Sequence, residues 1–213
     1  MAARKRTAVL ISGRGSNMSA LVAAAADPAY PAEVALVLSN RAAASGLEHA
    51  RAAGIATATV SYKAGREAAE AEMGAAFAAH GIELVCLAGF MRLLSAELVA
   101  AWRDRMINIH PSLLPLFPGL DTHERALSAG MKLHGCTVHF VRHEMDSGPI
   151  IGQAAVPVRA GDTPDTLGAR VLTAEHVLYP KALALVASGA VRVEDERCVG
   201  AVSPAATGML VSL

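Results

Sequence analysis

The stretch "MINIHPSLLPLFP", residues 106–118, joins the end of a buried strand to a proline-rich turn. Residues 106–110 have the short apolar pattern of a buried strand, and Pro111 ends it because proline cannot donate to a strand ladder. Side chains two residues apart lie on the same face of a strand, so Asn108 and His110 point the same way. The stretch therefore predicts an amide and an imidazole that emerge together at the carboxyl end of a strand.

Strands and helices alternate on the amino-terminal side of this stretch. Alanine-rich helical segments, at about 17–26, 45–53, 64–80 and 95–103, separate apolar runs typical of buried parallel strands, at 7–12, 33–39, 55–60, 82–88 and 106–110. This alternation predicts an α/β fold, a doubly wound, mostly parallel, Rossmann-like sheet with helices on both faces. Ligands of such sheets bind beyond the carboxyl ends of the strands, where Asn108 and His110 are expected.

The carboxyl-terminal side has a different order of elements. A short helix is expected at 121–130, followed by strands at 134–141 and 149–158 that we expect to form an antiparallel pair. A long helix follows, with Thr163 suited to its N-cap and Pro164 to its first position.

Neither a repeat nor a charged linker divides the chain. We therefore expect one domain over residues 1–195, with two halves at about 1–103 and 104–195. Residues 196–213 show no clear hydrophobic period and are expected to form an irregular tail.

Composition limits the function classes. The 213 residues carry 19 basic and 19 acidic side chains, so the formal net charge is zero and a nucleic-acid partner is not expected. No apolar run approaches the ~18 residues of a membrane span, so no membrane partner is expected either. The three cysteines (Cys86, Cys136, Cys198) are too few and too widely spaced for a disulfide framework or a zinc knuckle, which favours a cytoplasmic location. The histidines show no spacing typical of metal ligands, and no metal is expected.

A glycine loop, "SGRGSN" at residues 12–17, follows the first strand and opens a helix. Glycines let backbone N–H groups approach an anion at a helix N-terminus. Met18 stands where a dinucleotide fingerprint has its third glycine, and "LSN" at 38–40 supplies no acidic residue after the second strand. The loop therefore favours a phosphate site over an NAD site. The alternative is that the glycines serve only a turn that needs a positive φ and bind nothing.

Two carboxylates could converge on the same edge of the sheet. Asp146 lies in a turn, "HEMDSGPII" at 143–151, and Glu175 lies on the long helix, in "EHVLYP" at 175–180. Taken alone, Asp146 would be interpreted as a turn aspartate that caps its own backbone. Glu175 would be interpreted as a solvated carboxylate on the surface of the helix.

Six motifs together resemble a known family, in their order and spacing: "LISGRGSN", "AGFMRLLS", "INIHPSLLP", "HGCTVHFV", "DSGPII" and "RVLTAEHVLYP". The chain resembles the phosphoribosylglycinamide formyltransferases, folate-dependent enzymes of purine synthesis, from Thr7 to about Val193. The Asn-x-His block followed by Asp-x-Gly-Pro is specific to folate-dependent enzymes that handle formyl groups. The glycine loop and Glu175 point, within that group, to the ribonucleotide substrate.

The resemblance implies transfer of the formyl group of 10-formyltetrahydrofolate to the amine of 5'-phosphoribosylglycinamide. It implies a nucleotide-binding half at 1–103 and a folate-binding and catalytic half at 104–195. Asn108, His110 and Asp146 are the implied catalytic set. The implied ribonucleotide contacts are Gly15, Ser16, Asn17 and Glu175. The implied folate contacts are Arg66, Met91, Arg92, Leu93, Leu94, Asn108, Arg142, His143, Glu144, Met145 and Asp146.

The resemblance also implies a cis Leu114–Pro115 bond. Leu116 and Leu172 depart from the family pattern, since some members carry a basic residue at the first position and a polar residue at the second. These departures could weaken phosphate or ribonucleotide contacts without touching the catalytic set. Both expected partners are small molecules, and the resemblance leaves open whether the chain is a monomer or a homodimer.

The residue types suit this chemistry without a protein nucleophile. The substrate amine attacks the formyl carbon, and the developing oxyanion can be stabilised by the Asn108 amide and a protonated His110. Asp146, His110 or an ordered water could carry the proton from the attacking amine to the departing folate nitrogen.

Three alternatives use the same signature or part of it. A formyltetrahydrofolate deformylase is a hydrolase that usually carries an extra N-terminal regulatory domain. A methionyl-tRNA formyltransferase needs a tRNA-binding domain and a basic surface, which the length and the zero net charge do not accommodate. A non-catalytic nucleotide-binding module would leave Asn108, His110 and Asp146 without a purpose.

Overall fold

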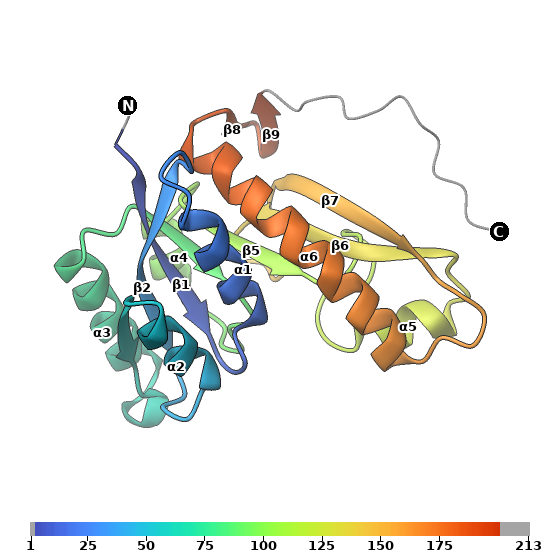
Figure 1. Cartoon of the computed structure of the whole chain (residues 1–213), viewed down its shortest axis with the longest axis horizontal. Coiled ribbons are helices and arrows are strands. Elements are labelled where there is room, and N and C mark those ends of the chain that lie inside the picture. Colours follow the sequence, from blue (N-terminus) through green and yellow to red (C-terminus); the bar gives the residue numbers. More distant parts are fainter. Residues whose placement is uncertain (1–2, 201–213) are drawn as a thin grey trace.

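A seven-stranded sheet forms the centre of the computed structural model, which describes residues 3–200 (Figure 1). The strand order is β3-β2-β1-β4-β5-β6-β7. The first five of these strands are mutually parallel, and β6 runs antiparallel to both β5 and β7. The bounds are β1 (Lys5–Ile11), β2 (Ala32–Ser39), β3 (Ala56–Thr59), β4 (Leu84–Leu87), β5 (Met106–His110), β6 (Leu133–Phe140) and β7 (Ile150–Pro157).

Helices cover both faces of the sheet (Figure 1). Val9 and Ile11 of β1 pack on one face against α1 (Ser16–Ala25), α2 (Ser45–Ala52) and the long α6 (Pro164–Ala187). Ala8 and Leu10 point to the other face, against α3 (Arg66–Ala79) and residues of α4 (Ala96–Ala101). The alternation along β1 thus builds a separate core on each face. A 3-10 turn (Tyr62–Ala64) precedes α3, and α5 (Thr122–Ser128) packs beside α6.

The start of α6 follows its sequence signals. The Thr163 hydroxyl accepts from the Thr166 N–H, the Thr166 hydroxyl accepts from the Thr163 N–H, and Pro164 occupies the first turn. This capping box satisfies backbone donors that would otherwise lack a partner at the helix end. Further along, the buried Tyr179 hydroxyl donates to the carbonyls of Leu87 and Ile107 at 3.0 and 3.2 Å, which ties α6 to the end of β4 and the first half of β5.

These observations confirm the predicted fold class and the antiparallel pair. The Leu114–Pro115 bond is cis, as the resemblance implied. The three cysteines carry free thiols. Within residues 3–200, every helix is too short or too polar to cross a membrane.

The expected irregular tail is wrong for its first residues. Arg197–Gly200 forms β9, which pairs antiparallel with β8 (Val191–Glu194) in a separate two-stranded sheet. Asp195 and Glu196 make the turn with φ of 48° and 57°, the left-handed conformation of a two-residue hairpin turn. Each strand has only four residues and the turn lacks glycine, so the usual hairpin signals are missing. The remainder of the predicted tail, 201–213, lies outside the described residues.

Candidate active site

The strand order reverses at β1, which makes this strand the switch point of the sheet. The chain passes from β1 outward to β2 and β3, then returns to place β4 on the other side of β1. Ligands of doubly wound sheets bind beyond the carboxyl ends of the strands at this switch point. The glycine loop follows β1, and Asn108 and His110 end the nearby β5.

Gly15 holds the glycine loop in a conformation that excludes larger residues. It precedes α1 with φ of 73°, and a Cβ there would lie 3.0 Å from Met18 Cε and 3.1 Å from Gly46 Cα. Gly46, at the start of α2, donates its N–H to the Gly13 carbonyl at 3.2 Å. No local sequence pattern predicts this contact, because Gly46 belongs to another helix.

Asn17 and Glu175 meet across 158 positions of sequence. The Asn17 amide donates to Glu175 Oε2 at 2.6 Å. Glu175 is only 6% exposed, and burial raises the pKa of its carboxyl while the Asn17 bond lowers it. Asn17 Oδ1 is buried and has no hydrogen-bond partner among residues 3–200. The two residues form a polar pair with an acceptor left over, so Glu175 is not a solvated surface carboxylate.

Asn108 is held by a histidine on the neighbouring strand. Asn108 and His139 are opposite each other in the β5–β6 ladder, and the Asn108 amide lies 3.2 Å from His139 Nε2. His139 Nδ1 is 3.0 Å from the Phe140 carbonyl, which can only accept. Burial lowers the pKa of His139. The ring is therefore neutral, with its proton on Nδ1, and Nε2 accepts from Asn108.

Asp146 connects His110 to the proline-rich turn. Its Oδ2 lies 3.4 Å from His110 Nδ1 and accepts the Gly119 N–H at 2.8 Å. The other ring nitrogen of His110, Nε2, is 2.9 Å from the Phe117 carbonyl. Both nitrogens thus face acceptors, an arrangement in which a protonated imidazole can donate twice. Asp146 has φ of 56°, so its turn conformation is the left-handed one in which Asp is tolerated.

His139 also lies 3.9 Å from Asp146 Oδ1. Since His139 is neutral, this contact is not an ion pair. The structure brings the three predicted catalytic residues together and adds His139, which sequence reasoning missed. In the sequence, the period of two along β6 puts His139 on the same face as Thr137. Only the β5–β6 register shows that this face lies opposite Asn108 and His110.

The loop that carries Asp146 runs back along β5. Because β6 is antiparallel to β5, its last residues lie beside the first residues of β5, and the Val141 N–H bonds the Met106 carbonyl at 2.9 Å. Asp146 nevertheless reaches His110, at the far end of β5. The loop therefore crosses the face of the strand on which Asn108 and His110 lie.

The expected folate contacts after β4 are joined to the glycine loop. The Met91 N–H donates to the Ser12 hydroxyl at 2.8 Å, and that hydroxyl donates to Asn40 Oδ1 at 2.5 Å. Ser12, which sequence reasoning left unassigned, thus links the two sets of contacts. Met91 and Leu93 are exposed, Leu94 is half-buried, and the Arg92 guanidinium lies 4.9 Å from the centre of the Tyr62 ring.

The other expected folate contacts fall into two groups. Arg66 begins α3 and lines a hollow with Glu70 and Ser95. Arg142 is engaged in ion pairs with Asp104 and Glu196. The remaining residues of that loop, His143, Glu144 and Met145, are exposed.

Of the two departures from the family pattern, Leu116 is exposed and Leu172 is half-buried.

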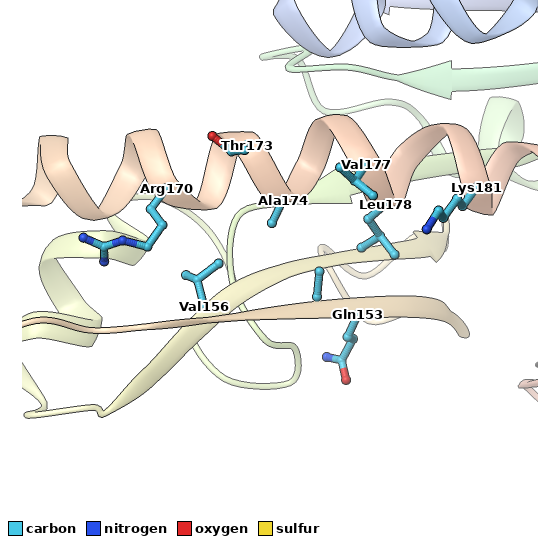
Figure 2. Close-up of a pocket in the computed structure, with 9 residues that line it drawn as sticks. Gln153, Val156, Arg170, Thr173, Ala174, Val177, Leu178 and Lys181 are labelled. Carbon is cyan, nitrogen blue, oxygen red and sulfur yellow. The ribbon is translucent and has the colours of Figure 1, made fainter. Parts of the chain in front are cut away.

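A separate groove lies between α6 and β7 (Figure 2). It has a volume of about 550 Å³, and its lining includes Gln153, Val156, Arg170, Ala174 and Leu178. None of the candidate site residues lines it, and Glu175 lies on another face of α6. In residues 3–200, His, Cys, Asp and Glu side chains form no group of three or more that could hold a metal ion.

The sheet and the Asn-His-Asp cluster define a formyl-transferring class of α/β protein. A model of the formyl transferase family matches residues 5–183, and the chain belongs to this family. It is 47% identical over 189 residues to the phosphoribosylglycinamide formyltransferase of Escherichia coli (strain K12), covering 88% of this chain and 89% of that one. It is 49% identical over 194 residues to the trifunctional purine biosynthetic protein adenosine-3 of Bos taurus, covering 90% of this chain. The chain spans about a fifth of that relative, 19% of its length.

Solved structures show the same architecture. A phosphoribosylglycinamide formyltransferase from Brucella melitensis superposes with a TM-score of 0.86 at 51% identity, covering 99% of this chain and 100% of that one. A formyltetrahydrofolate deformylase from Pseudomonas syringae superposes with a TM-score of 0.87 at 28% identity, covering 93% of this chain and 66% of that one. The fold is therefore shared with a transferase and with a hydrolase, while the sequence is closer to the transferase.

Proposed function

We propose that this protein transfers the formyl group of 10-formyltetrahydrofolate to the amine of 5'-phosphoribosylglycinamide in purine biosynthesis. The observation that carries the proposal is the cluster of Asn108, His110 and Asp146, with Asp146 Oδ2 lying 3.4 Å from His110 Nδ1. The similarity to the Escherichia coli enzyme over most of both chains supports this substrate pair. Both substrates are small molecules, so the activity needs neither nucleic acid nor membrane and suits a cytoplasmic monomer or homodimer.

The ribonucleotide binds at the glycine loop and α6. Gly15, Ser16 and Asn17 present backbone N–H groups at the start of α1, where the helix dipole favours a phosphate. Glu175, fixed by Asn17, accepts from the glycinamide end of the ribonucleotide. The unpartnered Asn17 Oδ1 supplies a further acceptor for the ribose region.

The folate binds across the segments that follow β4 and β6. Met91, Arg92, Leu93 and Leu94 form one side of this site, and the loop from Arg142 to Asp146 forms the other. Exposed Met91, Leu93 and Met145 offer apolar surface for the pterin and benzoyl rings, and Arg66 and Arg92 offer positive charge for the glutamate carboxylates.

In the reaction, the glycinamide amine attacks the formyl carbon and a new C–N bond forms. The carbonyl oxygen gains negative charge. An amide carries two N–H donors: His139 holds one N–H of Asn108, and the second can donate to this oxygen. A protonated His110 adds positive charge beside the oxyanion. Loss of one such donor typically costs about 10²–10³ in rate.

Collapse of the tetrahedral intermediate breaks the bond to the folate nitrogen. The amine must lose a proton and the folate nitrogen must gain one. The Asp146 side chain, about 10% exposed, lies beside His110 and can accept the amine proton, directly or through a water, and the pair can return it to the leaving nitrogen.

The test is to follow tetrahydrofolate release from 10-formyltetrahydrofolate with and without the ribonucleotide, together with formation of the formylated ribonucleotide. Release that depends on the ribonucleotide and matches product formation supports the transferase. Release at the same rate without the ribonucleotide would identify a hydrolase, the activity named for the Pseudomonas syringae neighbour. No release at all would refute both activities.

A further inference from the structure

We propose that Glu196, in the turn between β8 and β9, is a positioning residue for the loop that carries Asp146 and acts on that loop through Arg142. The inference rests on the proposed function, because it assigns Glu196 a part in placing a group of the proposed reaction. The residues involved come from three separate segments, and Glu196 lies in the hairpin beyond the carboxyl end of α6 (Figure 1).

Arg142 touches both ends of the loop. The loop follows β6 and is closed by the bond from the Phe140 N–H to the Pro149 carbonyl, at 2.9 Å. Arg142 stands near its beginning, and a Cβ at Gly148 would lie 3.1 Å from Arg142 Cγ, so the arginine stem packs against the end of the loop. Asp146 lies between these two residues. A shift of Arg142 therefore moves the loop backbone that carries Asp146.

Each of the three nitrogens of the Arg142 guanidinium donates a hydrogen bond within the protein. Its Nε donates to Glu196 Oε2 at 2.6 Å, its Nη2 donates to Asp104 Oδ1 at 2.7 Å, and its Nη1 donates to the Val141 carbonyl at 3.1 Å. The Arg142 side chain is only 11% exposed, against 54% for Glu196. A largely buried cation needs such partners, since an unpaired charge in this position is costly. Glu196 also pairs with Arg103, next to Asp104 in the sequence.

Turn chemistry does not explain a glutamate at position 196. In a two-residue hairpin turn with positive φ at both positions, Gly, Asn and Asp are preferred. Asp195 fits that preference, while Glu196 takes φ of 57° despite a long side chain. Its carboxylate, however, is the one that reaches Arg142 and Arg103. The strained residue is therefore the residue that makes the contacts.

Asp104, the second partner of Arg142, also combines a positive φ with an ion pair to this arginine. It takes φ of 57° in the segment that leads into β5, the strand of Asn108 and His110. Arg142 thus ties the Asp146 loop to the entry of the catalytic strand through Asp104 and to the hairpin through Glu196. Both links restrict the separation between Asp146 and His110.

The test compares two glycine variants of one turn. Glu196→Gly removes the carboxylate and relieves the left-handed strain, so the hairpin should fold at least as well as in the parent. Asp195→Gly is the matched control, because Asp195 has φ of 48° and forms no ion pair within residues 3–200. Arg142→Lys is a second variant, which keeps the charge but cannot hold two carboxylates in a planar fork.

We expect Glu196→Gly and Arg142→Lys to lower kcat by about tenfold and to raise the KM for 10-formyltetrahydrofolate. A displacement of about 1 Å can cost about 100-fold, so a tenfold loss corresponds to a smaller shift. The KM for the ribonucleotide should stay at the parent value. The melting temperature of Glu196→Gly should stay near that of the parent, because Arg142 keeps Asp104 as a partner, and the kinetics of Asp195→Gly should match the parent.

Equal kinetics for Glu196→Gly and Asp195→Gly, with an active parent, would overturn the positioning role. A parallel fall in melting temperature and in both KM values would also overturn it, since a purely structural role would do the same. Failure of the parent itself to formylate the ribonucleotide would refute the proposed function and is read separately from these variants.

Discussion

Asn108 on β5 and His139 on β6 are cross-strand partners, and the Asn108 amide donates to the neutral His139 ring at 3.2 Å. The bond determines which way the amide faces, because His139 Nε2 accepts and cannot serve the Asn108 oxygen. The amide proposed to be catalytic is thereby oriented by a side chain that need not touch the substrate.

His139→Phe should lower kcat by about tenfold or more while leaving both KM values near the parent. The phenyl ring keeps the packing but leaves one Asn108 N–H without its partner, and an unsatisfied buried donor costs about 1–3 kcal/mol. His139→Gln supplies a side-chain oxygen and should restore part of the rate. Steady-state kinetics of the two variants check this, and identical rates in both would argue against orientation by an acceptor.

Asp146→Asn should lower kcat by about 100-fold or more, the scale of a positioned acid–base group. The substitution keeps the size and one acceptor for the Gly119 N–H but removes the negative charge beside His110. Binding of both substrates, measured by calorimetry, should survive. Asp121→Asn is the control, because Asp121 has a similar φ of 55° and makes no side-chain cap at α5. Full turnover in a folded Asp146→Asn protein would contradict the proton-transfer role.

Gly15→Ala should raise the KM for the ribonucleotide at least tenfold and leave the folate KM unchanged. The new Cβ would press on Met18 and Gly46 and displace the backbone N–H groups proposed to hold the phosphate. Gly54→Ala is a matched control: Gly54 has the same φ of 73°, yet nothing lies within 4 Å of its Cβ position. Both variants should lose some stability from strain, but a rise in KM with Gly54→Ala would show that strain alone is responsible.

Stability should fall as the pH is lowered from about 6.5 to about 4. Burial, with a smaller effect from neighbouring His123, lowers the pKa of His134 to about 4. In the unfolded chain, histidine titrates near its ordinary value of about 6.5. The unfolded chain thus binds more protons in this window, and protonation favours unfolding by at most about 1.4 kcal/mol per pH unit for one histidine.

Urea unfolding at several pH values measures this slope. His134→Gln should make it shallower, because one of the histidines with a lowered pKa is gone. The exposed His49 on α2 gives the control variant, His49→Gln, which should retain the parent slope. An unchanged slope in His134→Gln would assign the pH dependence to other groups.

Local patterns were sufficient for the sheet and for part of the site. The period of two along residues 106–110 and the proline after them placed Asn108 and His110 on one face at a strand end. The β5–β6 register could not be derived in this way, so His139 was missed although it faces Asn108. The meeting of Asn17 and Glu175 depends on how α6 packs beside α1, which no local signal encodes. Only the family resemblance connected those two residues in advance.

The antiparallel direction of β6 constrains the number of residues between β6 and Asp146. Val141 sits beside Met106, and the Asp146 side chain reaches the His110 ring, so the loop backbone and this side chain together span the length of β5. Four residues of strand measure roughly 13 Å. The five steps from Val141 to Asp146 reach at most about 18 Å when fully extended. A single deletion in residues 142–145 would leave little slack and withdraw the carboxylate from the imidazole, whereas an insertion there could bulge outward. Proteins with this fold can therefore gain residues between β6 and the aspartate during evolution more readily than they can lose them.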